Sequence, residues 1–474
     1  MTLNQSIAKN SLVQLVGKLA SLVLGLISVA VMTRYLGLEN FGYYTTAIAF
    51  LQFFGIIVDF GLSLTTVQMI SKPGADVSKT MNAIMTLRVI SALIFLTLAP
   101  IVILFFPYDP LIKLGVLITV ESFFAATLIQ TMSGVFQKNL KMTEVTIAEV
   151  AGRLVLVGGI VAAALLHGSI LWVFAFISIA STVNLAVLWK FSRKYVDWRW
   201  QTDKAVWKEV WRRTWPIAIS ITFNLIYLKT DTIILSLVRS QSEVGLYGAT
   251  YRVIDILTML PAVYMGIILP LASNYFQANN FIELKKILQR AFDALMIFAV
   301  PIVVGTYLIA RPLMVFIAGS AFAPSGDILK VLIWASAAIF GTSLWGYALI
   351  AVEKQRTMTW AYGTAAFLTF AGYLYFIPKF GYWGAAWMTV FSEVLIMIWS
   401  AIVLHRAIKF FPSLKIFLKA IPAALIMAAA LYFLPQWHVF FQLLISGMIY
   451  FPLLYLFGGF EKETVMAIVR RTNG

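Results

Sequence analysis

The sequence TWPIAISITFNLIYLKTDTIILSLV (214–238) is followed, after a short polar turn, by GLYGATYRVIDILTMLPAVYMGIILPLASNYF (245–276). Each stretch is long enough to cross a bilayer, because a transmembrane helix needs about 20 mostly apolar residues. Both stretches nevertheless carry charges in their interiors, namely Lys229, Asp231, Arg252 and Asp255. Ionisable groups inside membrane segments are costly, so these four residues are candidate functional residues.

The composition of the whole chain predicts an all-α polytopic membrane protein. The 474 residues are 61% hydrophobic and 12% charged, whereas soluble domains carry roughly 25% charged residues. The length allows about 14 transmembrane helices, and the apolar runs are too continuous for a membrane β-barrel. The chain has no cysteine, which excludes disulfides and thiolate metal sites.

The expected transmembrane spans follow from the apolar runs. They are 11–35, 41–64, 80–106, 111–136, 143–167, 169–191, 214–238, 245–276, 287–309, 327–352, 357–377, 382–408, 416–434 and 437–457. Lys and Arg concentrate in alternate loops and in both tails, so the positive-inside rule places both termini in the cytoplasm. We therefore expect a multi-pass protein of the cytoplasmic (inner) membrane. The basic net charge has this topological explanation, and we expect no nucleic-acid partner.

The polar stretch 192–213 divides the chain. We expect an N-terminal lobe of six helices (1–191), a C-terminal lobe of six helices (214–408), and two extra helices with a cytoplasmic tail (409–474). Within the stretch, DKAVWKEVWRR (203–213) has apolar residues at helical spacing opposite Lys and Arg. This pattern predicts an amphipathic helix at the cytoplasmic surface. It is either a mechanical link between the lobes or a simple anchored linker.

Two short segments indicate an internal repeat. RYLGLENFGYY (34–44) and LVRSQSEVGLYG (237–248) align Phe41-Gly42-Tyr43-Tyr44 with Val244-Gly245-Leu246-Tyr247. The two segments hold the same ordinal position in their lobes, which predicts a parallel repeat about an axis along the membrane normal. Two such lobes around a cleft form the architecture of transporters that alternate access by rocking.

Two signatures carry a resemblance to a known family. NSLVQLVGKLASLVLGLISVAVMTRYLGLENFGYYTTAIAFLQFFGIIVDFGL (10–62) and YLKTDTIILSLVRSQSEVGLYGATYRV (227–253) resemble the polysaccharide-type flippases of the multidrug/oligosaccharidyl-lipid/polysaccharide (MOP) exporter superfamily. The resemblance implies a flippase, not an enzyme, for a polyprenyl-(pyro)phosphate-linked oligosaccharide. It would move this substrate from the cytoplasmic to the outer leaflet for surface polysaccharide assembly. We expect a monomer in the lipid bilayer that works with a polysaccharide polymerase and export machinery.

Three other functions are considered. A lipid II-type peptidoglycan precursor flippase has a similar fold, but such proteins usually carry several arginines in helices 1, 2 and 8. Well inside these spans, this chain has only Lys18 and Arg252. A cation-coupled drug or small-solute exporter of the same fold usually has fewer helices. A membrane enzyme would need a large polar loop with a catalytic cluster, and no loop between the expected spans is long enough.

The intramembrane cations are the candidate substrate-binding residues. Lys18 and Arg88 lie in the expected inner half of the membrane, and Lys229 and Arg252 lie in the outer half. A pyrophosphate that crosses an apolar core needs positive partners along its path, so these four cations could pass it from one lobe to the other. The alternative is structural salt bridging, with Arg252 bound to Asp231 or Lys18 bound to Asp59.

The intramembrane carboxylates are candidates for ion coupling or charge pairing: Asp59, Glu121, Asp231, Asp255 and Glu393. Glu121 and Glu393 stand alone near the middle of their spans, so each would be protonated, hydrated or bound to a cation. They therefore predict proton or sodium coupling. We expect no cofactor and no metal cluster, since the three histidines, His167, His405 and His438, are far apart in sequence.

Overall fold

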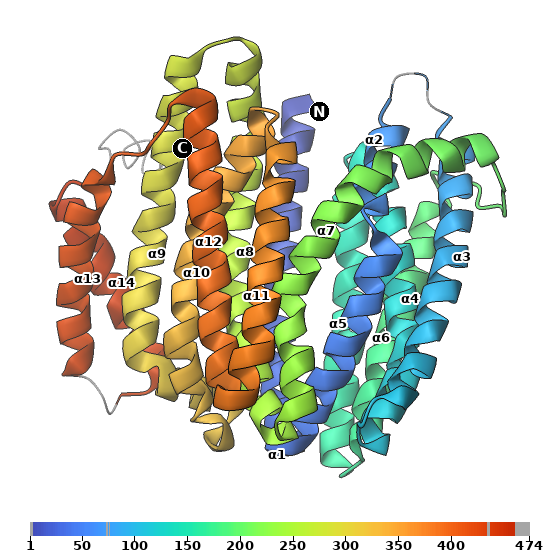
Figure 1. The fold of residues 1–474 in the computed structure, drawn as a ribbon, viewed down its shortest axis with the longest axis horizontal. Helices are drawn as coiled ribbons and strands as arrows, with labels where there is room; N and C mark the ends of the chain where they lie inside the picture. The colour runs from blue at the N-terminus through green and yellow to red at the C-terminus, as the bar shows by residue number, and fades with distance from the viewer. Residues whose placement is uncertain (1–2, 73, 75, 434–436, 460–474) are drawn as a thin grey trace. The chain divides into compact units, whose positions relative to one another are not determined.

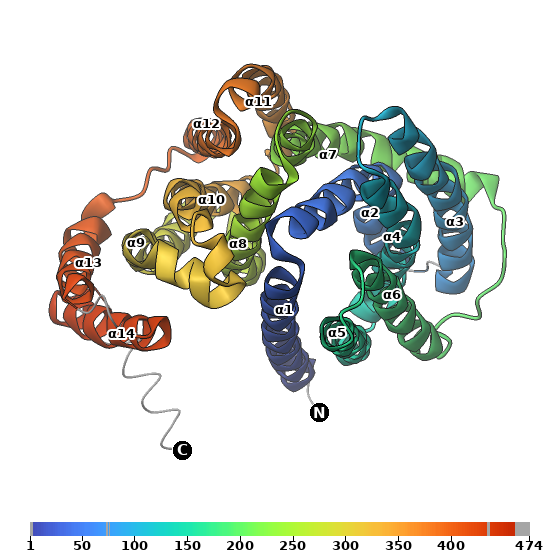
Figure 2. The same ribbon diagram turned by 90° about the horizontal axis from the view of Figure 1, so that it is seen from below.

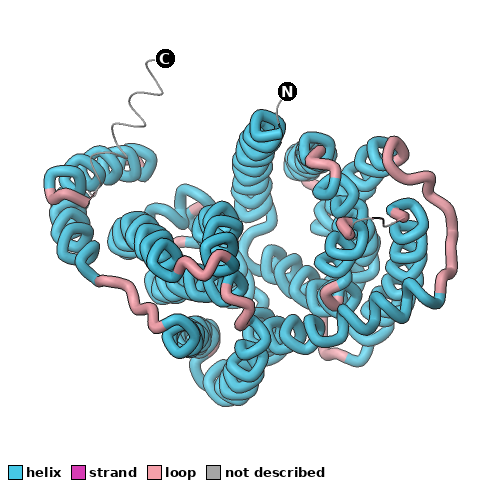
Figure 3. Tube along the Cα trace, turned by 90° about the horizontal axis from the view of Figure 1, so that it is seen from above, coloured by secondary structure: helices cyan, strands magenta, loops and turns pink. Residues whose placement is uncertain are grey.

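The computed structural model describes residues 3–72, 74, 76–433 and 437–459. The predicted tail beyond residue 459 lies outside these residues. The regular structure of the described chain is helical throughout, without strands (Figure 3). The prediction of an all-α membrane fold is confirmed.

The first two predicted spans form one long element with a sharp break. Helix α1 (Leu3–Asp59) changes direction at Gly37, whose φ is 70°. This left-handed conformation costs least at glycine, which has no Cβ. A second break at Phe60 and Gly61, with φ of 45° and 82°, separates α1 from the short helix α2 (Leu62–Ile70).

The next four helices lie close to their predicted bounds. They are α3 (Val77–Val102), α4 (Pro110–Lys138), α5 (Met142–Leu165) and α6 (Ile170–Ser192). The carboxylate of Asp76 accepts from the Lys79 N–H to cap α3, and that of Asp109 accepts from the Leu111 N–H to cap α4. Such caps satisfy backbone donors that have no partner in the first helical turn.

The amphipathic linker is continuous with the helix that follows it. Helix α7 (Lys204–Val238) contains both the predicted surface segment and the predicted span, and its first part lies across the end of the N-terminal helices before the helix turns (Figure 1). Asp203 caps α7 and forms an ion pair of 3.0 Å with Lys79. Hydrogen bonding from the Val206 N–H and then from Lys79 lowers the pKa of Asp203. The linker is therefore attached to α3.

The remaining helices complete the fold. They are α8 (Gln241–Gln277), α9 (Phe281–Ala318), α10 (Ser325–Ala351), α11 (Met358–Phe380), α12 (Tyr382–Ile408), α13 (Phe417–Tyr432) and α14 (Val439–Leu456). Within the described residues, 11 helices are long and apolar enough to cross a membrane. The protein is therefore a multi-pass membrane protein, and the full number of spans stays a prediction.

The helices form two compact units. The N-terminal unit contains Met1–Ala249 and Tyr373–Tyr382, and the C-terminal unit contains Thr250–Gly372 and Trp383–Gly474. In the N-terminal unit, α4, α5 and α6 pack together and α1 packs on α4 and α5 (Figure 2). In the C-terminal unit, α9 packs on α10, and α13 and α14 lie beside α9. The units divide within α8, and the predicted division into lobes at 192–213 stays a prediction.

Candidate functional site

Arg88 of α3 and Asp59 at the end of α1 form a buried ion pair in the N-terminal unit. The Arg88 side chain is completely buried, and its Nη2 lies 2.6 Å from Asp59 Oδ1. The same guanidinium donates to Ser63 Oγ at 2.8 Å and to Thr131 Oγ1 at 2.8 Å. Burial of a charge is tolerated when it is paired and hydrogen-bonded, and Arg88 meets both conditions.

The break between α1 and α2 explains why this pair forms. At the end of a helix the last carbonyls have no intrahelical partner, and Arg88 Nη1 donates to one of them, Val58 O, at 2.9 Å. A cation at this position also interacts favourably with the helix dipole. Asp59 in turn accepts from the Gly61 N–H at 3.3 Å. The ion pair therefore closes the end of α1 within the N-terminal unit.

These contacts correct one expectation about the inner charges. The alternative pairing of Lys18 with Asp59 is wrong, because Asp59 pairs with Arg88. Lys18 lies exposed on the first part of α1. Arg88 serves a structural purpose in this conformation, and its contact with substrate stays a prediction.

Asp231 of α7 is also completely buried. It accepts a hydrogen bond of 2.7 Å from the Tyr247 hydroxyl and one of 2.6 Å from the Thr232 N–H. Lys229, two residues earlier, is half-buried. Sequence reasoning missed Tyr247 as a partner of Asp231, although the tyrosine lies in the family signature and in the repeat.

A second buried tyrosine contacts the same helix. The Tyr108 hydroxyl lies 2.8 Å from Ser236 Oγ of α7. Burial raises the pKa of Tyr108 to about 12, so the phenol stays protonated at neutral pH and can donate to Ser236. Polar contacts of α7 with its neighbours thus include two phenol hydroxyls, from Tyr108 and Tyr247.

The repeated motif forms a close helix crossing between α1 and the start of α8. A Cβ added at Gly42 would meet Gln241 O at 1.8 Å, and one added at Gly245 would meet Leu38 O at 2.2 Å. The alignment that equates Gly42 with Gly245 also equates Leu38 with Gln241. Gly42 thus approaches Gln241, and Gly245 approaches Leu38, which is the residue equivalent to Gln241 in the other half of the repeat. Contacts of this reciprocal kind are those of a two-fold axis.

In the C-terminal unit, Arg252 and Asp255 lie on α8 at i, i+3 spacing. Arg252 is half-buried and Asp255 is exposed. Neighbouring residues join α8 to other helices, since Thr250 Oγ1 donates to Ser325 O and the Tyr251 hydroxyl lies 3.2 Å from Thr389 Oγ1. The segment of α8 around Arg252 is thus held against α10 and α12.

Glu393 of α12 lies one helical turn after Thr389 and is 4% exposed. Its carboxyl group interacts electrostatically with the Tyr362 hydroxyl of α11. No lysine or arginine of the described chain forms an ion pair with Glu393. It is a buried acid without a counter-charge, as its isolation in the sequence predicts. The C-terminal unit also has three buried hydroxyls that lack a hydrogen-bond partner within the described residues, those of Ser336, Thr342 and Thr369.

Glu121 of α4 has a different environment. The Thr182 hydroxyl of α6 donates to Glu121 Oε1 at 2.7 Å. The second oxygen, Oε2, is buried, and no group in the described part of the chain bonds to it. Among these residues no three His, Asp or Glu side chains gather as ligands for a metal ion. Any cation at Glu121 would therefore need hydroxyl, carbonyl or water ligands.

Comparison with known proteins now identifies the family. The model of the polysaccharide biosynthesis protein family matches residues 7–276, which is more than half of the chain. The chain belongs to this polysaccharide biosynthesis family. Both signatures lie within the match, so the predicted family is confirmed. No curated protein matches the sequence.

Solved structures show that this family member has a transporter fold. A structure described as lipid II flippase MurJ in an inward closed conformation matches with a TM-score of 0.78 and 17% identity, over 93% of this chain and 98% of that one. An inward-facing multidrug resistance MATE family transporter of the MOP superfamily matches with a TM-score of 0.65 and 14% identity, over 81% and 94% of the two chains. A structure of the MATE multidrug transporter DinF-BH matches with a TM-score of 0.64 and 16% identity, over 86% and 97%.

The candidate charged residues of this polysaccharide biosynthesis protein include three groups. Asp59 and Arg88 neutralise each other, and they fix the end of a broken helix. Lys18 is an exposed cation, and Lys229 and Arg252 are half-buried cations that take part in other interactions of the chain. Glu121 and Glu393 have oxygen atoms that can take a proton or a cation.

Proposed function

We propose that this protein is a flippase for a polyprenyl-(pyro)phosphate-linked oligosaccharide in surface polysaccharide assembly. It moves the substrate from the cytoplasmic to the outer leaflet of the inner membrane by alternating access, and it catalyses no covalent reaction. The observation that carries the proposal is the family match over residues 7–276, which includes the charged spans. The fold it shares with a lipid II flippase supports a lipid-linked substrate.

In this proposal three cations bind the anionic part of the substrate, namely Lys18, Lys229 and Arg252. Lys18 contacts the pyrophosphate in the inner half of the membrane, and Lys229 and Arg252 contact it in the outer half. Guanidinium and ammonium groups form strong charge-assisted hydrogen bonds with phosphate oxygens, and more so where water is scarce. Arg88 joins them only when its ion pair with Asp59 opens.

Coupling to an ion gradient is assigned to the carboxyl groups. Glu393 is buried and forms no ion pair within the described part of the chain, so a proton or a sodium ion that binds there neutralises it. Glu121 has one free oxygen for the same purpose. Asp231 and Asp255 lie close in sequence to the candidate cations Lys229 and Arg252. Their negative charges partly offset the positive potential of these cations. No cofactor is required, and the protein works as a monomer with both termini in the cytoplasm, next to a polymerase and export machinery.

The glycine crossing gives the proposed cycle a closing contact. Gly42 and Gly245 allow the backbones of α1 and α8 to touch, and the predicted topology places this contact at the outer end of the helices. Release of substrate to the outer leaflet then requires the two helices to separate there. A larger side chain at either glycine would hold them apart.

The test is transport by purified protein in liposomes. A fluorescent polyprenyl-pyrophosphate oligosaccharide is placed in the membrane, and its exposure on the opposite face is followed by chemical quenching. Arg252→Ala and Lys18→Ala should each reduce the rate at least tenfold, whereas Arg356→Ala, which removes an exposed charge between α10 and α11, should leave it unchanged.

Three results would contradict the proposal. Wild-type rates in both Arg252→Ala and Lys18→Ala would remove the role of the cations. Transport of lipid II in preference to the oligosaccharide lipid would make the protein a peptidoglycan precursor flippase. Efflux of cationic dyes without any lipid movement would make it a drug exporter.

A further inference from the structure

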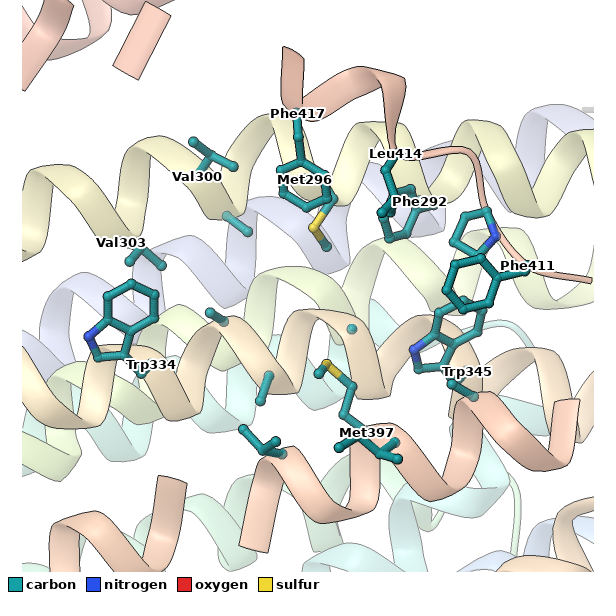
Figure 4. A pocket seen from close by; sticks show the side chains of 18 of the residues that line it. Phe292, Met296, Val300, Val303, Trp334, Trp345, Met397, Phe411, Leu414 and Phe417 are labelled. Carbon is teal, nitrogen blue, oxygen red and sulfur yellow. The ribbon is translucent and has the colours of Figure 1, made fainter. Parts of the chain in front are cut away.

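The C-terminal unit contains a large apolar bay that the proposed transport path does not use. It has a volume of about 1260 Å³ and lies between α9, α10, α12 and the start of α13 (Figure 4). Pockets for drug-sized ligands measure roughly 300–1,000 Å³, so this bay is larger than a small solute requires. Among its walls are Met296, Trp334, Trp345, Met397 and Phe411.

Small residues create the bay. Ala337, Ala338 and Gly341 of α10 line it, and their short side chains leave room between the longer ones of α9 and α12. Along α12 the lining runs from Trp387 to Arg406, a length of about 28 Å at the helical rise of about 1.5 Å per residue. The bay thus extends over nearly the whole hydrocarbon thickness of a bilayer, which is about 30 Å. Its shape suits hydrocarbon chains.

One end of the bay is strongly basic. His405 and Arg406 line it there, and Lys409 and Lys415 follow in the segment that leads to α13. The sequence has no Asp or Glu from 394 to 460. Arg406, Lys409 and Lys415 are exposed, and none of them forms an ion pair with a described residue. The positive-inside rule places this end at the cytoplasmic surface.

The segment that carries these cations is held in place. Gln289 of α9 donates to Ser413 O at 3.1 Å, and its Oε1 accepts from the Ser413 N–H at 2.7 Å. Gln289 also donates to Asp293 at 2.9 Å, so the carboxylate of α9 near this end is bound to a neutral amide. On α12, His405 Nδ1 lies 3.3 Å from Phe410 O, to which it can donate. The basic end of the bay is thus a built rim rather than a loose loop.

We propose that the bay binds an anionic glycerophospholipid of the inner leaflet. The acyl chains lie against α9, α10 and α12, and the phosphate lies among Arg406, His405 and the two lysines. The occupant is not the transported lipid, because no residue of α8, which carries Arg252, lines the bay. The bound lipid fills the space between α12 and the start of α13, whereas α13 is held to the unit by direct packing on α9.

Native mass spectrometry of the purified full-length protein tests the proposal. The protein is titrated with dioleoyl phosphatidylglycerol and, separately, with dioleoyl phosphatidylethanolamine. The wild type should prefer phosphatidylglycerol. Arg406→Gln should weaken phosphatidylglycerol binding about fivefold, the value expected for one basic residue near an anionic lipid surface. It should leave phosphatidylethanolamine binding unchanged.

Two further variants complete the design. Arg356→Gln removes the same charge from an exposed residue that does not line the bay, and it should retain the preference. Ala401→Phe fills the bay beside Met397 and should weaken the binding of both lipids. If Ala401→Phe does not fold, Ala337→Phe tests the same space from α10.

Several outcomes would overturn the proposal. The first is that the wild type binds the two lipids with equal affinity. The second is that Arg406→Gln and Arg356→Gln lose the same affinity for phosphatidylglycerol, and the third is that Ala401→Phe binds both lipids as the wild type does. Displacement of phosphatidylglycerol by a polyprenyl phosphate would show that the bay belongs to the substrate. A protein that is dimeric through this face would show that a second copy covers it. None of these measurements depends on lipid flipping, so the test stands apart from the proposed function.

Discussion

Asp59 and Glu393 are both carboxylates inside helical membrane segments, but their surroundings differ. Asp59, in the N-terminal unit, meets a buried arginine at 2.6 Å and a backbone N–H at 3.3 Å. Glu393, in the C-terminal unit, is 4% exposed and forms no ion pair with any described residue. A carboxylate with a fixed partner contributes to structure, whereas one without a counter-charge is free to exchange a proton or a cation. The stability of variants should separate the two.

The largest effect is expected when the Asp59 pair is broken. Arg88→Leu leaves the carboxylate without its cation and Val58 O without a donor, so the free energy of unfolding should fall by about 3–5 kcal/mol. Thermal unfolding in detergent measures this loss, with Arg356→Leu as a matched control. The double variant Arg88→Leu/Asp59→Leu should recover much of it, because no unpaired charge remains. If Arg88→Leu is as stable as Arg356→Leu, the ion pair has no structural role.

Asp231 lies between the two cases, because hydroxyl and amide groups bind it. Tyr247→Phe removes one hydrogen bond to a buried carboxylate and should cost about 1.5–3 kcal/mol. Tyr43→Phe, which removes an exposed phenol that bonds to Glu39, is the control and should cost much less. Equal losses in these two variants would show that the Asp231 contact is unimportant. The same unfolding measurement applies.

Glu121 tests a carboxyl group that is bound through one oxygen. Thr182→Val keeps the shape of the side chain and removes its donor, which should cost about 1 kcal/mol if the acid is protonated. A loss as large as that in Tyr247→Phe would instead indicate that Glu121 is ionised and belongs with Asp231. Measuring the loss of unfolding free energy in Thr182→Val at two pH values, one above and one below neutrality, distinguishes a protonated Glu121 from an ionised one.

Glu393 should show the smallest effect on stability and a clear effect on transport. Glu393→Gln replaces a buried carboxyl group, neutral when a proton is bound, with a neutral amide of nearly the same shape. The free energy of unfolding should therefore change less than in Thr182→Val. Transport in liposomes should lose its dependence on the imposed proton or sodium gradient. Glu353→Gln, at an exposed position after α10, should retain it. If transport by the Glu393→Gln protein still depends on the gradient, Glu393 does not couple transport to an ion.

The sequence predicted most of the helices, because long apolar runs are unambiguous and caps such as Asp76 and Asp109 lie where the runs begin. The break at Phe60 and Gly61 was not predicted, since a single glycine does not distinguish a break from a close contact. Linear spacing placed Asp59 and Arg88 at similar depths, but it did not show that they meet. Only the packing of α3 against α1 and α2 determines that contact.

The lone character of Glu393 was predictable, because no cation lies near it in the sequence. Tyr247 was missed because its phenol reaches Asp231 from a different helix. The apolar bay could not be predicted either. Its alanines and glycine cannot be distinguished in the sequence from the small residues found in any membrane helix.

The reciprocal glycine contact has a consequence for the origin of the chain. A two-fold contact between equivalent segments is what remains when the two subunits of a homodimer are joined by gene fusion. In a homodimer, a mutation beside the two-fold axis appears in both subunits. In a fused chain, each of the two equivalent segments can change independently. Leu38 and Gln241 have diverged, which the contact tolerates because it involves only their backbone atoms. Gly42 and Gly245 are still the same residue, since any side chain there would strike the opposite backbone.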